Sequence, residues 1–296
     1  MTLVPTPDGR VLEVVDRGPA ADRALLYHHG QPGAATVSPQ LASACAEAGL
    51  RLVTYARPGY GDSTRRPDGT RPFTVADDIA DITVVLDAVG VSDFVTLGWS
   101  GGGPRAIACA ALLPNRCRGA VSLAGVAPKS GDPATGMGPA WFDGMAEDNV
   151  REYAASLEGE ASLRPLIEAE AVGMAAMTGP EVAGAIGSLV SAVDVAALDG
   201  AMADWVAASF RDACRRGADG FVDDALVTMR PWGFELRAVT VPVHVWQGTQ
   251  DRMVPFGHGA WLAEHVGGAV PHLVEGAGHI SLWGAIRTIL TDLTTG

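Results

Sequence analysis

A serine in a glycine-rich turn is the strongest sign of chemistry in this sequence. Ser100 lies at the centre of a Gly-x-Ser-x-Gly motif, between Gly98 and Gly102. An apolar run precedes the motif and an alanine-rich helical pattern follows it. A tight strand-to-helix turn needs small flanking residues and raises the serine hydroxyl above the sheet edge. The pattern predicts a nucleophile, with a glycine-rich turn holding an incidental serine as the alternative, and it matches neither common phosphate-binding motif.

A serine hydroxyl attacks only when a base takes its proton, so a histidine must lie nearby. Of the seven histidines, His279 is favoured because it follows the last predicted strand in a glycine-containing loop. Asp251 ends the preceding strand and could orient the imidazole, whereas Asp132 is a weaker rival. The order Ser100, Asp251, His279 is one of three known chain orders for a catalytic triad. A capping or surface role for His279, and a turn-only role for Asp251, are the alternatives.

Attack on a carbonyl creates an oxyanion, which needs hydrogen-bond donors already in place. The segment Tyr27-His-His-Gly-Gln-Pro-Gly directly follows an early predicted strand. We expect the backbone N–H groups of Gln31 and Gly101 to form the oxyanion hole, because Gly101 follows the nucleophile and Gln31 lies in this turn. The alternative for Gln31 is a place in an ordinary turn.

The elements around these residues alternate between strand and helix. Seven apolar runs have the character of strands: 11–15, 24–28, 52–55, 94–97, 119–123, 241–246 and 269–274. Helical spacing relates Ile79, Ile82, Leu86 and Val89, and again Ile286, Ile289, Leu290 and Leu293. This alternation predicts parallel strands joined by helices that lay one apolar stripe on a sheet.

The alternation stops between about Pro128 and Arg237, where the sequence shows helical pattern and no convincing strand. One apolar face there consists of Val182, Ala185, Ile186, Leu189 and Val190. We expect residues 128–237 to form a helical cap inserted between two strands of one sheet. Residues 1–127 and 238–296 then form the core domain.

Charge and composition exclude several classes of partner. The chain has 296 residues, with 21 Lys and Arg against 34 Asp and Glu, so its formal net charge is −13. This excess of negative charge disfavours nucleic acid and anionic membranes as partners. No apolar run approaches the ~18 residues that a spanning helix needs. We expect a small-molecule substrate, and a homodimer is compatible with the sequence.

Cysteine and lysine usage narrows the chemistry further. Cys45, Cys109, Cys117 and Cys214 form no C-x-x-C pair, which disfavours a disulfide framework and a zinc site. Lys129 is the single lysine, so Schiff-base chemistry has one candidate, in a loop-like stretch. The N-terminus lacks the pattern of a secretion signal. We therefore expect a cytoplasmic protein that needs neither metal nor cofactor.

Several motifs taken together resemble the α/β-hydrolase superfamily over nearly the whole chain, in particular its proline-iminopeptidase and esterase-like branch. They are His29-Gly-Gln-Pro-Gly, Arg57-Pro-Gly-Tyr-Gly-Asp-Ser, Gly98-Trp-Ser-Gly-Gly-Gly-Pro, Gly248-Thr-Gln-Asp and Gly276-Ala-Gly-His. The resemblance implies a mostly parallel eight-stranded sheet flanked by helices, with a helical cap between strands 6 and 7. It also assigns the triad and oxyanion roles to the residues named above.

Two departures from this family bear on the activity. Gln31 and the segment Tyr55-Ala-Arg-Pro replace residues usual in proline iminopeptidases, which disfavours aminopeptidase activity. A serine at position 100, where an aspartate would stand in haloalkane dehalogenases and epoxide hydrolases, disfavours those two chemistries. For the loop 57–62, which we call the Arg57 loop, a contact of Arg57 with Asp62 or with the backbone is favoured over substrate binding.

The sequence thus predicts a serine hydrolase that cleaves an ester, amide or thioester of a small, apolar substrate through an acyl-enzyme. Expected pocket residues, for which core packing is the alternative, are His29, Trp99, Trp141, Met145, Met177 and Trp205. Other functions compatible with the same residues are aminopeptidase, carbon–carbon bond hydrolase, cofactor-free perhydrolase and non-catalytic ligand receptor.

Overall fold

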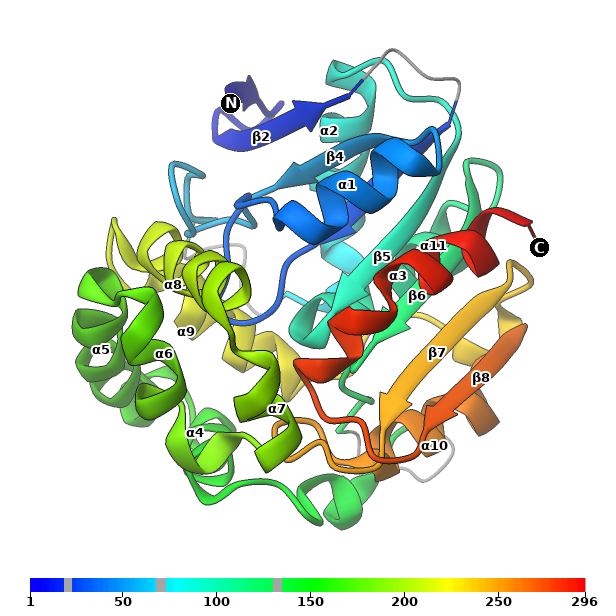
Figure 1. Ribbon diagram of the computed structural model, residues 1–296. Coiled ribbons are helices and arrows are strands. Elements are labelled where there is room, and N and C mark those ends of the chain that lie inside the picture. The colour runs from blue at the N-terminus through cyan, green and yellow to red at the C-terminus, as the bar shows by residue number, and fades with distance from the viewer. Residues whose placement is uncertain (19–22, 68–72, 130–134, 296) are drawn as a thin grey trace.

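An eight-stranded sheet forms the centre of the molecule (Figure 1). The computed structural model describes residues 1–18, 23–67, 73–129 and 135–295. The strands are β1 (Thr2–Pro5), β2 (Val11–Arg17), β3 (Ala24–His28), β4 (Arg51–Tyr55), β5 (Phe94–Trp99), β6 (Cys117–Leu123), β7 (Val243–Gly248) and β8 (Ala269–Val274). All seven predicted strands are present, and only the short β1 was not expected.

The strands follow the order β1-β2-β4-β3-β5-β6-β7-β8. The β1–β2 and β2–β4 pairs are antiparallel, and all the other pairs are parallel. The central strand β3 is buried along its whole length, as apolar runs in a sheet covered on both faces should be. The predicted mostly parallel sheet is confirmed.

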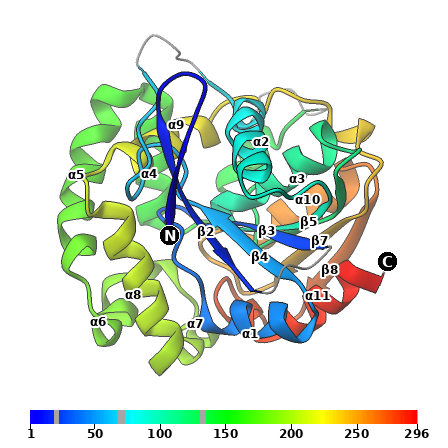
Figure 2. The same ribbon diagram turned by 90° about the horizontal axis from the view of Figure 1, so that it is seen from above.

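Helices cover both faces of the sheet (Figure 2). On one face α1 (Pro39–Glu47) and α11 (Ile286–Thr295) pack through Leu41, Ile289 and Leu290. On the other face lie α2 (Asp78–Ala88), α3 (Gly103–Leu112) and α10 (Phe256–His265), which contribute Ile82, Ile107 and Leu262 to the core. The predicted apolar stripes around residues 82 and 289 therefore face the sheet.

The described residues between β6 and β7 form helices joined by loops and contain no strand. The main helices are α4 (Glu147–Glu158), α5 (Glu160–Ala176), α6 (Gly179–Ala185), α7 (Ala192–Ala197), α8 (Gly200–Cys214) and α9 (Asp219–Thr228). The apolar face predicted over 182–190 is interrupted, because α6 ends at Ala185 and a short 3-10 turn begins at Gly187, whose φ is +20°. We call the segment from 128 to 237 the insertion; in Figure 1 it lies to one side of the sheet.

Within the described ranges, no helix has both the length and the apolar character that crossing a membrane requires.

Candidate active site

Ser100 occupies a strained turn between β5 and α3. Its φ is +55°, a left-handed conformation that non-glycine residues seldom adopt. Close packing leaves no room for a side chain at either motif glycine. A Cβ added to Gly98 would lie 2.1 Å from the carbonyl oxygen of Gly102, and one added to Gly102 would lie 2.2 Å from that of His28. The strand–turn–helix setting that the motif predicts is therefore present around Ser100.

His279 and Asp251 form a buried pair. Nδ1 of His279 lies 2.8 Å from Oδ2 of Asp251. The carboxylate is itself held in place, because its Oδ1 accepts from the N–H groups of Met253 at 2.9 Å and Val254 at 2.8 Å. The amide of Gln247 donates to Oδ2 at 3.1 Å. This arrangement orients the imidazole and leaves Nε2 as the nitrogen that can exchange a proton.

The electrostatics of this pair favour a protonated imidazole. Burial lowers the pKa of His279, but the charge and hydrogen bond of Asp251, together with the charge of Asp194, outweigh burial and raise the pKa above its ordinary value. A histidine with a raised pKa is a stronger proton acceptor when it is neutral, which suits a general base.

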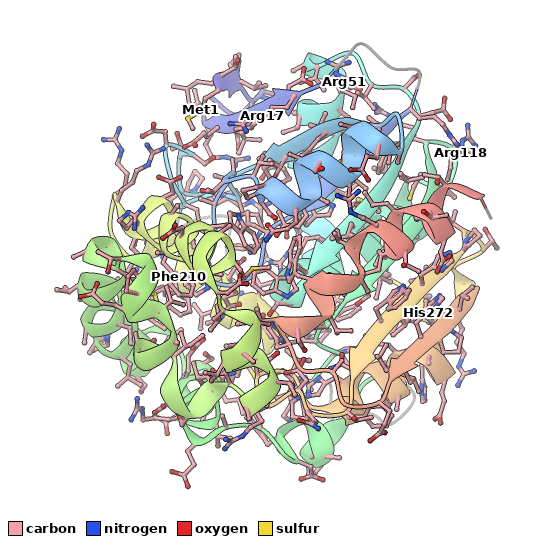
Figure 3. All side chains as sticks on the ribbon, viewed as in Figure 1. Met1, Arg17, Arg51, Arg118, Phe210 and His272 are labelled. Carbon is pink, nitrogen blue, oxygen red and sulfur yellow. The ribbon has the colours of Figure 1, made fainter. Side chains whose placement is uncertain are left out.

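Ser100 and His279 line one cavity of about 420 Å³. The insertion supplies much of its wall, including Met174, Met177 and Phe210. Figure 3 labels Phe210 on helix α8, on the opposite side of the molecule from His272 of the edge strand β8. The cavity thus lies between the insertion and the end of β5 that carries the serine.

The structure brings Gln31 and Gly101 together. A Cβ added to Gly101 would lie 2.9 Å from the Cβ of Gln31 and 3.5 Å from its backbone nitrogen. The Gln31 amide donates to Oε1 of Glu152 at 2.9 Å. Burial, reinforced by the nearby charge of Glu170 and opposed by the Gln31 hydrogen bond, raises the pKa of Glu152 to about 8. Glu152 therefore presents a mostly neutral carboxylic acid to the cavity at pH 7.

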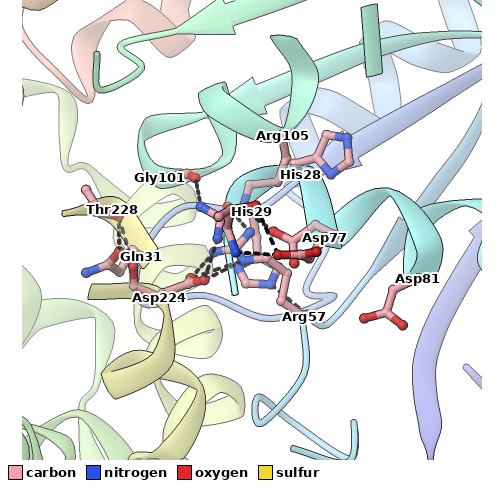
Figure 4. A network of polar contacts seen from close by, with 12 residues as sticks. His28, His29, Gln31, Arg57, Asp77, Asp81, Gly101, Arg105, Asp224 and Thr228 are labelled. Atoms are coloured by element: carbon pink, nitrogen blue, oxygen red, sulfur yellow. Dashed lines mark hydrogen bonds and ion pairs between the residues drawn. The ribbon is translucent and has the colours of Figure 1, made fainter. Parts of the chain in front are cut away.

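A buried ionic network supports the backbone segments next to Gln31 and Gly101 (Figure 4). Arg57 donates to the carbonyl oxygens of His29 at 2.7 Å and Gly30 at 2.8 Å. Arg105 donates to the carbonyl oxygen of Gly101 at 2.8 Å. Both guanidinium groups pair with Asp224, which lies on α9 of the insertion. One carboxylate from the insertion therefore braces two segments of the core.

The expected contact between Arg57 and the backbone is therefore present, whereas the alternative contact between Arg57 and Asp62 is not among the described contacts. Asp62 pairs with Arg215 and Arg216 of the insertion, whereas Arg57 pairs with Asp224. The sequence offered no sign that a residue so distant along the chain would take the place of Asp62.

Of the six expected pocket residues, Trp99 and Met177 line the cavity and the other four do not. Trp141 is fully buried, and its indole N–H donates to the carbonyl oxygen of Ala127 at 2.7 Å. Met145 belongs to the same separate hydrophobic cluster as Trp141. Core packing, the alternative for these residues, is therefore their role.

Trp205 and His29 support the site from behind instead of lining it. The ring of Trp205 lies 5.5 Å from that of Trp99, and its N–H donates to the carbonyl oxygen of Thr36. Nε2 of His29 accepts from the N–H of Arg57 at 3.1 Å, and Nδ1 lies 2.8 Å from the carbonyl oxygen of Gly30. Burial and the charge of Arg57 lower the pKa of His29, so the ring is neutral.

Three further sequence-based expectations concern Asp132, Lys129 and a metal site. Asp132, the rival of Asp251, lies outside the described residues. The Lys129 ammonium lies 5.5 Å from the centre of the Phe142 ring. Within the described part of the chain, no group of three or more His, Cys, Asp or Glu side chains could hold a metal ion.

Three carboxyl groups of the insertion that contact the site or its supports were not predicted from the sequence: Glu152, Asp194 and Asp224. Each is buried and contacts a residue outside the insertion. Acidic residues are common on helices, and only the three-dimensional contacts distinguish these three from the rest.

Comparison with known proteins places this geometry in a family. Residues 23–285 match the family model described as the alpha/beta hydrolase fold. A bifunctional esterase/perhydrolase of Acinetobacter calcoaceticus is 32% identical over 115 residues, which are 39% of this chain and 41% of that protein. A non-heme chloroperoxidase of Streptomyces lividans is 33% identical over 129 residues, 43% of this chain and 46% of that protein. The matches thus span less than half the length of these two relatives.

The similarity to solved structures extends over the whole chain. An enol-lactonase from Burkholderia xenovorans LB400 superimposes with a TM-score of 0.67 at 18% identity, covering 100% of both chains. At this level of identity the likeness concerns the fold. Since the family model covers most of the sequence, the chain belongs to the alpha/beta hydrolase fold family.

Proposed function

We propose that this protein is a serine hydrolase that cleaves carboxylic esters. The observation that carries the proposal is one cavity lined by both a strained serine and a histidine paired with a buried aspartate. Membership of the alpha/beta hydrolase family and partial similarity to an esterase support it. Amides and thioesters are substrates of the same chemistry.

The proposed reaction has two steps. Oγ of Ser100 attacks the carbonyl carbon while Nε2 of His279 takes the hydroxyl proton, and Asp251 stabilises the imidazolium. The backbone N–H groups of Gln31 and Gly101 hold the oxyanion. The alcohol leaves with the proton from His279, and a water molecule deprotonated by the same imidazole then releases the acid and regenerates the serine.

The apolar part of the cavity wall supports a small, largely apolar substrate. This part includes Trp99, Met174, Met177, Ile186 and Phe210. The carboxyl group of Glu152 is mostly neutral at pH 7, so it costs an apolar substrate little in binding. We propose that residues 128–237 act as a cap that excludes water and selects the acyl group.

Perhydrolysis is the second candidate, supported by the partial similarity to a bifunctional esterase/perhydrolase. In this reaction hydrogen peroxide replaces water as the attacking group on the acyl-enzyme. The acyl–Ser100 bond breaks, a peracid forms, and the proton of the peroxide passes through His279 to the serine.

The proposal is tested with p-nitrophenyl esters carrying acyl chains of two to twelve carbons, beside proline and alanine p-nitroanilides. We expect ester hydrolysis that Ser100→Ala abolishes and that Ser43→Ala, an exposed serine on α1, leaves unchanged. A Ser100→Ala variant with full activity would refute the assignment of the nucleophile. Turnover of anilides alone would indicate an aminopeptidase, and peracid formation from an ester plus peroxide would establish the second candidate.

A fluorophosphonate separates an enzyme from a receptor on the same fold. We expect mass spectrometry to find one adduct, on Ser100 of the folded protein. No adduct would contradict a catalytic role, whereas labelling without turnover of any ester would favour a ligand receptor.

We also propose a cytoplasmic location. All four cysteines are buried free thiols, which suits a reducing compartment. Cell fractionation tests the location, and light scattering of the purified protein tests whether it is a homodimer.

A further inference from the structure

A buried carboxylate on the insertion contacts the loop that carries His279. Asp194 lies on helix α7 and is fully buried. Its Oδ2 accepts from the backbone N–H of His279 at 3.0 Å. Its Oδ1 accepts from the N–H groups of Ile280 at 2.8 Å and Ser281 at 2.9 Å. The hydroxyl of Ser191 donates to Oδ2 at 3.0 Å and so orients the carboxylate.

These contacts satisfy a run of backbone donors that has no local partner. The short 3-10 helix η7 (Ser281–Ala285) begins here, and no side chain of its own N-cap residue accepts from it. Hydrogen bonds from backbone N–H groups to a carboxylate are stronger than neutral ones. Without Asp194, three consecutive N–H groups would lose their acceptor in a buried setting, and the loop would have to shift to find others.

The fit between loop and carboxylate is tight. A Cβ added to Gly278 would lie 2.3 Å from Oδ2 of Asp194 and 2.4 Å from Oδ1. The indole N–H of Trp99, next to the nucleophile, lies 3.4 Å from the carbonyl oxygen of His279. The backbone of His279 is thus fixed on one side by the insertion and on the other by the turn that carries Ser100.

We propose that Asp194 is a positioning residue for His279: its carboxylate fixes the backbone of residues 279–281 and so sets where the imidazole lies relative to Ser100. This inference rests on the proposed function. It gives the insertion a part in the reaction beyond covering the cavity, since the loop that carries the base is held by an insertion residue.

Asp194 also acts on His279 through its charge. Burial lowers the pKa of His279, while the charges of Asp251 and Asp194 raise it. Among the described residues, these two carboxylates are the charged groups that shift this histidine. A residue that only capped the backbone donors would affect stability alone. A residue that positions His279 and also raises the pKa of its imidazole affects the pH at which this base becomes active.

The test measures the rate at which a fluorophosphonate labels Ser100 between pH 5 and 9. In Asp194→Asn the side chain keeps its size but loses its charge and turns an NH₂ group toward the N–H donors. We expect the plateau rate to fall about 10- to 100-fold through misplacement of the base. We expect the acid limb to move to lower pH by roughly 0.5 to 1 unit, because a charge that raises the pKa has been removed.

Asp81→Asn is the matched control. Asp81 is a buried carboxylate that pairs with Arg10 and Arg66 and does not contact the His279 loop. We expect this variant to lose stability but to keep the acid limb at its original pH. Thermal unfolding of each variant shows whether the labelling rates refer to folded protein.

Gly278→Ala perturbs the same contact from the loop side while keeping the charge. We expect a lower plateau rate, and a double variant with Asp194→Asn that is little slower than the slower single variant.

The outcomes separate the two proposals. Wild-type protein that is not labelled at Ser100 would remove the proposed function and this inference with it. Wild-type labelling with an unchanged rate in Asp194→Asn would overturn the inference alone. A fall in rate that Asp81→Asn reproduces would also overturn it, because the loss would then follow from weakened folding and not from the position of His279. A lower plateau rate in folded Asp194→Asn alone, with the acid limb unmoved, would support the positioning role and remove the electrostatic one.

Discussion

Asp224 offers the sharpest test of how the insertion supports the site. It is buried and accepts hydrogen bonds from Arg57 at Nε, from Arg105 at 3.0 Å and from the hydroxyl of Tyr60 at 3.0 Å. The perturbation is Asp224→Asn, which preserves the shape of the side chain and removes its charge. Asp78→Asn is the matched control, since Asp78 is also buried and also bridges two arginines, Arg66 and Arg105.

The two variants differ in the carboxylate partners that remain for the arginines. In Asp78→Asn each arginine keeps another carboxylate, Asp81 for Arg66 and Asp224 for Arg105. In Asp224→Asn Arg105 keeps Asp78, but Arg57 keeps no carboxylate among its described partners. Leaving one buried charge unpaired costs about 3–5 kcal/mol of unfolding free energy. The control should cost about 1–3 kcal/mol, the range for lost hydrogen bonds.

Urea unfolding monitored by fluorescence measures both free energies, and ester hydrolysis below the unfolding transition measures the effect on the site. We expect Asp224→Asn to lower kcat/KM about 10- to 100-fold, because Arg57 and Arg105 hold the segments of Gln31 and Gly101. Equal destabilisation by the two variants would refute the argument from unpaired charge. Full activity in folded Asp224→Asn would refute the role of the network in holding the proposed oxyanion hole.

Three further predictions concern pH and backbone geometry. Since the pKa of His279 is raised, kcat/KM should fall as pH decreases through a midpoint above the ordinary histidine value; a pH–rate profile with a lower midpoint would contradict this. The carboxyl group of Glu152 becomes charged above about pH 8, so KM for a neutral apolar ester should rise there in the wild type, and KM should stay constant in Glu152→Gln. Gly98→Ala would place a Cβ 2.1 Å from the oxygen of Gly102, so it should abolish fluorophosphonate labelling, whereas Gly184→Ala, with open space, should label normally.

The fold and the places of Ser100, Asp251 and His279 at the ends of strands could be predicted because their signals are local. Ser100, Asp251 and His279 each follow a strand within a few residues, and parallel strands bring their carboxyl ends to one edge. Apolar periodicity likewise marked the helices that face the sheet. The antiparallel β1 has only four residues, too few for a periodic pattern to stand out.

The supporting contacts could not be predicted because they join residues far apart in the chain. Asp194 and His279 are separated by 85 positions, and Arg57 and Asp224 by 167. Four of the six predicted pocket residues were wrong for another reason. Large apolar side chains such as Trp141 predict burial, but the sequence does not distinguish burial in the core from a place in a cavity wall.

The double attachment of the insertion bears on how such a protein could change its substrate in evolution or design. A lid that merely covered the cavity could be exchanged for a foreign one with little loss. Here a transplanted insertion would also have to supply acidic groups in the places of Asp194 and Asp224. Without them Arg57 would lose its carboxylate partner, and the backbone of His279 would lose its hydrogen-bond acceptor. New specificity is therefore more accessible through single substitutions along the inner wall than through replacement of the whole segment.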